Sequence, residues 1–259
     1  MIDLTFSLTD LEYFLLILMR VTAFMYSVPF FSTNGTPDRV KIGLSIFISY
    51  SLYTLMPDGA VEYNSVFTYA IIVVKETLTG LLIGYGAQIC TTILNLAGHI
   101  SDMETGLSMV TVYDPSTREN VTITGAYYQY GVTLLLMITG MYQYVFAALK
   151  ETFVLIPING AVFSSENLLA AMIEFLVDYM SIGLRICLPV FGVMLLLNSL
   201  LGILAKVSPQ MNMFAVGIQI KVLVGLGVLF LTVSLLPSIS NMILAEMKKM
   251  ITVFTESML

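Results

Sequence analysis

The sequence predicts an all-α membrane protein. Of its 259 residues, 58% are hydrophobic and 11% are charged, whereas a soluble domain carries about 25% charged residues. The apolar residues form long uncharged runs at 77–98, 120–149, 186–205 and 222–245. Each run reaches the roughly 20 residues that a helix needs to cross a bilayer. No amphipathic polar stripe accompanies these runs, which argues against the core of a soluble helical protein.

Six helices are predicted in order along the chain, at about 12–30, 40–56, 64–98, 121–156, 167–206 and 212–250. Short groups of helix-breaking residues separate them. These groups are Asn34-Gly35 with Pro37, Pro57-Asp58-Gly59, Asp114-Pro115, Pro157 through Gly160, and Ser208-Pro209.

The predicted helices are longer than a bilayer requires. A helix over 64–98 measures roughly 50 Å at about 1.5 Å per residue, and the hydrocarbon core is only about 30 Å thick. The last three predicted helices are equally overlong. They therefore tilt and bend, or they meet other chains, and Pro189, Gly192 and Gly202 are candidate bend points.

The basic residues give a weak topology signal. An outer N-terminus places Arg39, Lys41 and Lys206 on the cytoplasmic side, but it also places Lys150 and Lys248 outside. The positive-inside rule predicts a stronger bias in a chain of six simple crossings. Such ambiguity is typical of a chain that neighbouring subunits hold in place.

No pattern in the sequence predicts an enzyme, a metal site or a cofactor. His99 is the single histidine, and no nucleophile-elbow, zinc-protease or phosphate-loop spacing occurs. The net charge of −6 and the lack of a basic cluster argue against nucleic acid as a partner. Cys90 and Cys187 lie in apolar runs and are predicted to be buried free thiols, although a disulfide stays open.

Several ionisable residues lie inside predicted apolar helices, where a charge is costly without a partner or a cavity. One interpretation is a proton or ion relay. The interpretation we favour is pairing between helices or between subunits. The predicted buried charges are Arg20, Glu76, Glu174, Asp178 and Arg185.

Gly80 and Gly84 form a small-residue pair one helical turn apart. In an apolar helix, this spacing allows a second helix to approach closely. The pattern is common, so by itself it predicts a packing contact and no function.

The segment from Gly98 to Val121 mixes small, polar and bulky apolar residues between two very apolar helices. Connections within compact domains are usually about 4–6 residues long, and longer loops often have a role of their own, such as a lid or a plug. From the residues alone, an ordinary structural loop is the slightly favoured alternative.

Several short motifs occur along the chain. They are Ala97-Gly98, Gly106-Leu107-Ser108, Asp114-Pro115, Arg20 with Pro29, Pro37 through Lys41, and Pro209 through Phe214 followed by Gly217. Together these motifs resemble the FliR family of flagellar biosynthetic proteins, and the resemblance covers essentially the whole chain. Glu104, which lies close to Asp102, departs from the family pattern, because many relatives carry glutamine there.

The resemblance implies long kinked helical hairpins in a hetero-oligomeric helical assembly. It implies a core subunit of the flagellar type III export gate, in the bacterial inner membrane at the flagellar basal body. The implied partners are FliP-like and FliQ-like subunits, an FlhB-like protein at the cytoplasmic entrance, membrane lipid, and unfolded flagellar proteins that pass through the pore. Residues 1–165 correspond to a FliP-like part, and 166–259 to a FliQ-like hairpin.

The resemblance also implies roles for two segments. The plug of the closed pore is the segment from Gly106 towards Val121, with Gly106, Leu107, Ser108, Met109, Val110, Thr111, Val112, Tyr113, Asp114 and Pro115 as its site residues. The turn that contacts neighbouring subunits consists of Pro209, Gln210, Met211, Asn212, Met213 and Phe214.

Two alternative functions stay open. One is the homologous gate subunit of a virulence injectisome. The other is a small secondary transporter that uses the buried charges as a relay, for which inverted repeats are expected. No such repeat is visible in the sequence.

Overall fold

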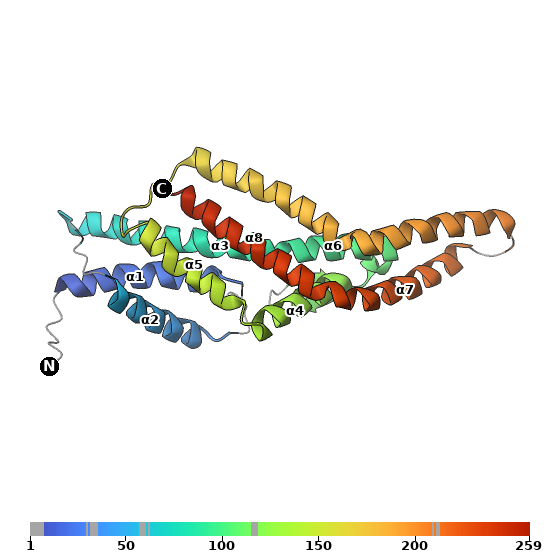
Figure 1. The fold of residues 1–259 in the computed structure, drawn as a ribbon, viewed down its shortest axis with the longest axis horizontal. Helices are drawn as coiled ribbons and strands as arrows, with labels where there is room; N and C mark the ends of the chain where they lie inside the picture. The colour runs from blue at the N-terminus through green and yellow to red at the C-terminus, as the bar shows by residue number, and fades with distance from the viewer. Residues whose placement is uncertain are drawn as a thin grey trace. The chain divides into compact units, whose positions relative to one another are not determined.

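The computed structural model describes residues 8–29, 31, 36–56, 61, 63–114, 119–208, 210 and 213–259. Over these ranges the protein is helical apart from one small hairpin, which confirms the predicted all-α class (Figure 1). The helices are α1 (Leu8–Ser27), α2 (Asp38–Leu55), α3 (Val66–Thr105), α4 (Ile123–Ile138), α5 (Tyr142–Leu155), α6 (Ser165–Val207), α7 (Met213–Thr232) and α8 (Leu236–Glu256). Short 3-10 turns lie at Leu107–Met109 and Val233–Leu235, and the strands are β1 (Thr111–Asp114) and β2 (Glu119–Thr122).

Three helical stretches in the described residues are long and apolar enough to cross a membrane. They are Val66–Thr105, Ser165–Val207 and Ala215–Glu256. Helices α4 and α5 pass the same test only as a pair. The prediction of a membrane protein is therefore confirmed, while α1 and α2 do not qualify as spans and six simple crossings are not supported.

The chain divides into two compact units. The first unit contains Met1–Cys90, Met141–Phe175 and Glu246–Leu259, and the second contains Thr91–Gly140 and Leu176–Ala245. Each unit is discontinuous in sequence, so neither corresponds to the predicted parts 1–165 and 166–259. That division stays a prediction about likeness to other subunits.

Three of the predicted helices differ from the structure, one in its end and two in their continuity. The third helix was expected to end at Gly98 and continues to Thr105. The predicted helix 121–156 is two helices, because Gly140 adopts a left-handed φ of 69° between them. The last predicted helix is interrupted by the 3-10 turn that precedes Pro237, which is consistent with the preference of proline for the first turn of a helix.

In the first unit, α1 and α2 pack side by side (Figure 1). Gly80 and Gly84 of α3 face α1 at close range: a Cβ atom on Gly80 would lie 2.0 Å from the Arg20 carbonyl oxygen. One on Gly84 would lie 2.7 Å from the Ser27 Cβ atom. The two glycines therefore allow the close helix approach that their spacing predicts.

In the second unit, α3 and α4 cross at an equally close contact. A Cβ atom on Gly98 would lie 2.2 Å from the Cα atom of Gly125. After this crossing along the chain, α4 buries Tyr128, Val132 and Leu136. These residues are spaced by four positions, so they share one face of the helix.

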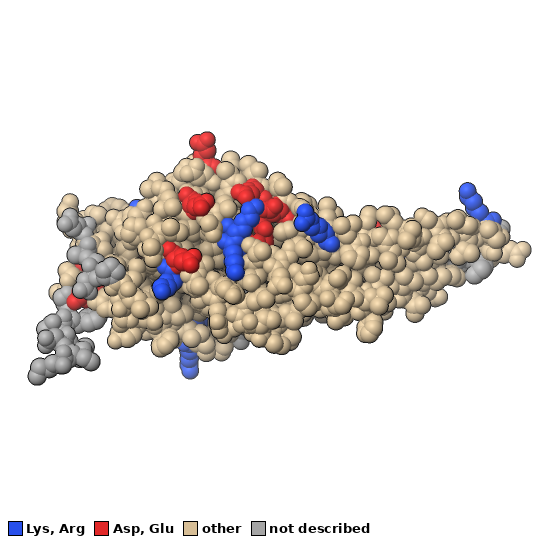
Figure 2. All heavy atoms as spheres, viewed as in Figure 1, with Lys and Arg blue, Asp and Glu red and all other residues tan. Residues whose placement is uncertain are grey.

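Charged side chains are unevenly distributed over the surface. On the face shown in Figure 2, they gather over α5, the start of α6 and the end of α8, which belong to the first unit. Much of the rest of this face carries no charge. Large uncharged surfaces of this kind suit lipid or partner subunits better than water.

Candidate functional site

A β-hairpin follows directly on the end of α3. Gly106 ends the helix with a left-handed φ of 82°, and the 3-10 turn Leu107–Met109 leads into β1. Strands β1 and β2 are antiparallel, with Thr111 opposite Thr122 and Asp114 opposite Glu119. The prediction of a plain loop from Gly98 is thus corrected, and the β-branched residues of the two strands were the signal for the hairpin.

The hairpin exposes several apolar side chains. Val110, Val112 and Tyr113 are exposed, with 59% of Tyr113 accessible. Leu107, in contrast, is buried. Exposed bulky side chains along a short ribbon are suited to meet another chain or to fill an opening.

The other predicted plug residues differ in position. The polar residues Ser108 and Thr111 are exposed, whereas Asp114 is buried. Pro115 lies outside the described residues, as does the side chain of Met109.

Asp102 anchors the far side of the hairpin by capping α4. Its buried carboxylate accepts a hydrogen bond from the backbone N–H of Thr124 at 2.9 Å, and a second one from the Thr124 hydroxyl. The Thr122 hydroxyl accepts from the N–H of Gly125 at 3.3 Å. Two side chains therefore satisfy the first free N–H groups of α4, and the carboxylate lies at the positive end of the helix dipole.

Asp114 ties the end of β1 to α4. The Tyr130 hydroxyl donates a hydrogen bond to its carboxylate at 2.8 Å, and Asp114 is 2% exposed. Asp102 holds the start of α4 directly after β2, and Asp114 holds the end of β1 next to the turn. The two acids therefore attach opposite ends of the hairpin. The sequence indicated an acidic approach to the loop, but it did not indicate that these two acids hold the hairpin.

In the first unit, Arg20 and Glu76 form a fully buried ion pair. The Arg20 Nε atom lies 2.6 Å from Oε2 of Glu76, and both side chains are 0% exposed. The guanidinium also donates to the carbonyl of Ile156 at 2.9 Å and stacks on the ring of Phe153. Pairing of this kind, between helices, is the interpretation that the sequence favoured for these residues.

The same pair holds the turn after α5. Glu76 accepts a hydrogen bond from the backbone N–H of Asn159 at 2.8 Å, and Lys75 donates to the Asn159 carbonyl at 2.8 Å. Asn159 has a left-handed φ of 66°, a conformation that asparagine tolerates better than most residues. Three side chains from α1 and α3 therefore fix the connection that leads to α6.

The other three predicted buried charges are less enclosed in this chain. Glu174 is exposed and pairs with Lys249 at 2.7 Å, Arg185 is exposed, and Asp178 is half-buried. Within this chain alone, Glu174 and Arg185 are therefore exposed, and their burial against other subunits stays a prediction. The physical reason is that α6 turns much of its apolar surface outward, so an apolar neighbourhood in sequence does not mean an enclosed position.

The predicted contact turn lies largely outside the described residues. The structure does not describe Pro209, Met211 and Asn212. Gln210 lies in a turn. Met213 and Phe214 begin α7, but their side chains are outside the described part. The role of this turn stays a prediction.

Within the described residues, no group of three or more His, Cys, Asp or Glu side chains is placed to hold a metal ion. His99 is exposed, and its Nδ1 atom lies 2.7 Å from the carbonyl oxygen of Asn95. Cys90 and Cys187 are buried thiols that form no disulfide with each other, as predicted.

These features define a class of protein: a helical membrane protein in which the buried carboxylates of Glu76, Asp102 and Asp114 hold helices and turns together. The family described as bacterial export proteins, family 1, matches residues 11–247. The chain therefore belongs to this family, which confirms the resemblance read from its motifs.

Relatives named flagellar biosynthetic protein FliR align over most of their length. The protein from Escherichia coli strain K12 is 28% identical over 82% of this chain and 80% of its own. That from Bacillus subtilis strain 168 is 25% identical, with 86% of each chain covered. That from Aquifex aeolicus is 24% identical over 86% of this chain and 85% of its own.

Proposed function

We propose that this chain is a core subunit of the flagellar type III protein export gate, located in the bacterial inner membrane at the flagellar basal body. The observation that carries the proposal is the family match over residues 11–247. Relatives named as flagellar biosynthetic proteins, aligned over more than four-fifths of this chain, support it. The role is passage of other proteins and involves no catalysis by this chain.

The chain forms the export pore together with FliP-like and FliQ-like subunits, and an FlhB-like protein binds at the cytoplasmic entrance. The uncovered apolar surfaces of α6 and α7 support this arrangement. Leu196, Leu223 and Phe230 are among the large side chains exposed there, at 69%, 74% and 77%. Such surfaces need lipid or neighbouring subunits to cover them. Residues 1–165 act as the FliP-like part and 166–259 as the FliQ-like hairpin.

The hairpin that begins at Gly106 plugs the closed pore. Its support is geometric: Val110, Val112 and Tyr113 are exposed, while buried acids hold the ribbon at both ends, Asp102 near its base and Asp114 next to its turn. A plug needs this combination of a fixed base and free bulky side chains. Unfolded flagellar proteins displace it when they thread through the pore.

The turn from Pro209 to Phe214 contacts the FliQ-like subunit. The position of this turn in the sequence, between the two long apolar helices α6 and α7, supports such a contact. Replacing Gln210 and Asn212 by alanine should weaken co-purification of the FliQ-like chain. Unchanged assembly and motility would count against this contact.

The deciding experiment is co-expression of the tagged chain with the FliP-like and FliQ-like chains of the same genome, followed by native mass spectrometry in mild detergent. One complex that holds all three chains supports the proposal. A chain that ignores these partners and moves a small solute in liposomes overturns it in favour of the transporter. Deletion of the gene should abolish secretion of flagellar subunits, whereas loss of effector secretion alone would indicate an injectisome.

A further inference from the structure

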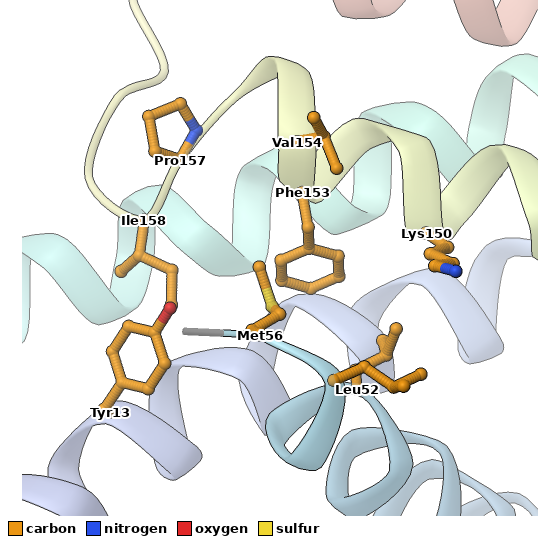
Figure 3. Close-up of a pocket in the computed structure, with 9 residues that line it drawn as sticks. Tyr13, Leu52, Met56, Lys150, Phe153, Val154, Pro157 and Ile158 are labelled. Atoms are coloured by element: carbon orange, nitrogen blue, oxygen red, sulfur yellow. The ribbon is translucent and has the colours of Figure 1, made fainter. Parts of the chain in front are cut away.

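A pocket opens in the first unit among α1, α2 and α5 (Figure 3). Its volume is about 350 Å³, which lies within the usual size range of small-ligand sites. Leu52, Met56, Phe153 and Pro157 contribute apolar side chains to its wall. The wall is fixed on one side, because the ring of Phe153 stacks on the buried Arg20 guanidinium at 4.5 Å. Such a wall is suited to a hydrocarbon chain and gives a polar metabolite little to bind.

Two polar groups lie at the edges of this apolar wall. In Figure 3, Lys150 lies on one side of the pocket and Tyr13 on the other. Lys150 is exposed and, among the described residues, has no hydrogen bond or ion pair. An unpaired ammonium beside an apolar pocket matches a ligand that is apolar at one end and anionic at the other.

The pocket lies where helices end. Leu52 and Met56 are at the C-terminal end of α2, and Phe153 is near the end of α5. Helix α5 is the second half of a stretch that is long and apolar enough to cross a membrane. The end of such a stretch lies near the lipid headgroups, where tyrosine and lysine are favoured.

We propose that this pocket binds an anionic phospholipid, with an acyl chain along the apolar wall and the phosphate on Lys150. The site is specific for an anionic headgroup because the cation at its rim has no acidic partner among the described residues. This inference goes beyond the export function and does not depend on it, since any bilayer that holds the chain supplies the ligand.

The chain contains no tryptophan, so one introduced tryptophan reports on this pocket alone. Val154 lines the pocket one turn from Lys150 and is 79% exposed, which makes Val154→Trp a mild change. The purified variant is reconstituted in phosphatidylcholine vesicles that contain equal mole fractions of brominated phosphatidylglycerol or brominated phosphatidylcholine. We expect about fivefold stronger quenching by the anionic lipid, the enrichment that one lysine near a membrane surface provides.

Two controls make the result specific. In the Val154→Trp background, Lys150→Gln should remove the preference, whereas Lys206→Gln, an equal change of charge on another exposed lysine, should leave it. Phe230→Trp on the apolar face of α7 should be quenched equally by both lipids. Equal quenching of Val154→Trp by both lipids overturns the headgroup assignment. No quenching at position 154, with normal quenching at position 230, overturns the lipid site and indicates that protein covers the pocket.

Discussion

The carboxylate of Asp102, near the end of α3, caps the first turn of α4 through the backbone N–H of Thr124 at 2.9 Å. The two residues are 22 positions apart, and the hairpin lies between them in sequence. The helix that follows the hairpin therefore begins at an end that a buried carboxylate holds. This arrangement gives the base of the proposed plug a fixed attachment.

Replacing Asp102 by alanine should destabilise the protein by about 1–3 kcal/mol, because a helix cap is lost and a buried N–H is left without a partner. Asp102→Asn should cost less, since it keeps one acceptor oxygen. Unfolding in mixed micelles can be followed by reaction of the buried thiols of Cys90 and Cys187 with a fluorescent dye. The matched control is Glu104→Gln, a change at a neighbouring acid, and an equal loss there would contradict the capping role.

Gly98→Ala should destabilise the second unit by about 1–3 kcal/mol, the usual cost of overpacking. The added Cβ atom would lie 2.2 Å from the backbone of Gly125, and a backbone cannot move aside as a flexible side chain can. Gly43→Ala is the control, because its Cβ atom meets no atom within 4 Å. It should raise stability by about 0.5–1 kcal/mol through helix propensity. If the two variants behave alike in the thiol assay, the close crossing is wrong.

Arg20→Met and Glu76→Gln should each cost about 3–5 kcal/mol, because each leaves the other charge buried and unpaired. The double variant should cost less than the sum of the two, since no uncompensated charge remains. The exposed pair Glu174–Lys249 supplies the comparison: Glu174→Gln should change stability by at most about 1 kcal/mol. Strict additivity of Arg20→Met and Glu76→Gln would show that the two residues act independently.

Tyr130→Phe removes the hydroxyl that donates to Asp114 at 2.8 Å and leaves the ring in place. If the hairpin is the plug, this variant should loosen it and raise the leak of a small impermeant dye into cells that express the complete gate. The control is Tyr113→Phe, which changes a hydroxyl on an exposed residue of the same hairpin. A leak that is unchanged by Tyr130→Phe, with the complex intact, would separate this hydrogen bond from closure of the pore.

Much of the fold could be predicted from local sequence. Long apolar runs need a non-aqueous environment and helical backbone pairing, so the class of the protein and most helices follow from them. The motifs at Ala97-Gly98, Asp114-Pro115 and Pro209 through Phe214 gave the family. The spacing of Gly80 and Gly84 gave a close helix contact, although it did not say which helix comes near.

The candidate site depended on contacts between distant residues. The residues after Gly98 resemble a loop in sequence, yet they continue α3. Ser101, Asp102 and Thr105 are buried there, and Asp102 finds its hydrogen-bond partner on α4. Gly140 lies in an uninterrupted apolar run, so only its backbone conformation revealed the break between α4 and α5.

The same distinction holds for the charges. The sequence determined that Arg20, Glu76, Glu174 and Arg185 lie in apolar helices, because hydropathy is a property of neighbours along the chain. Only the tertiary structure decided that Arg20 and Glu76 meet across 56 residues while Glu174 and Arg185 face outward. Burial of a charge depends on which helix faces pack together, and that depends on the whole set of helix contacts.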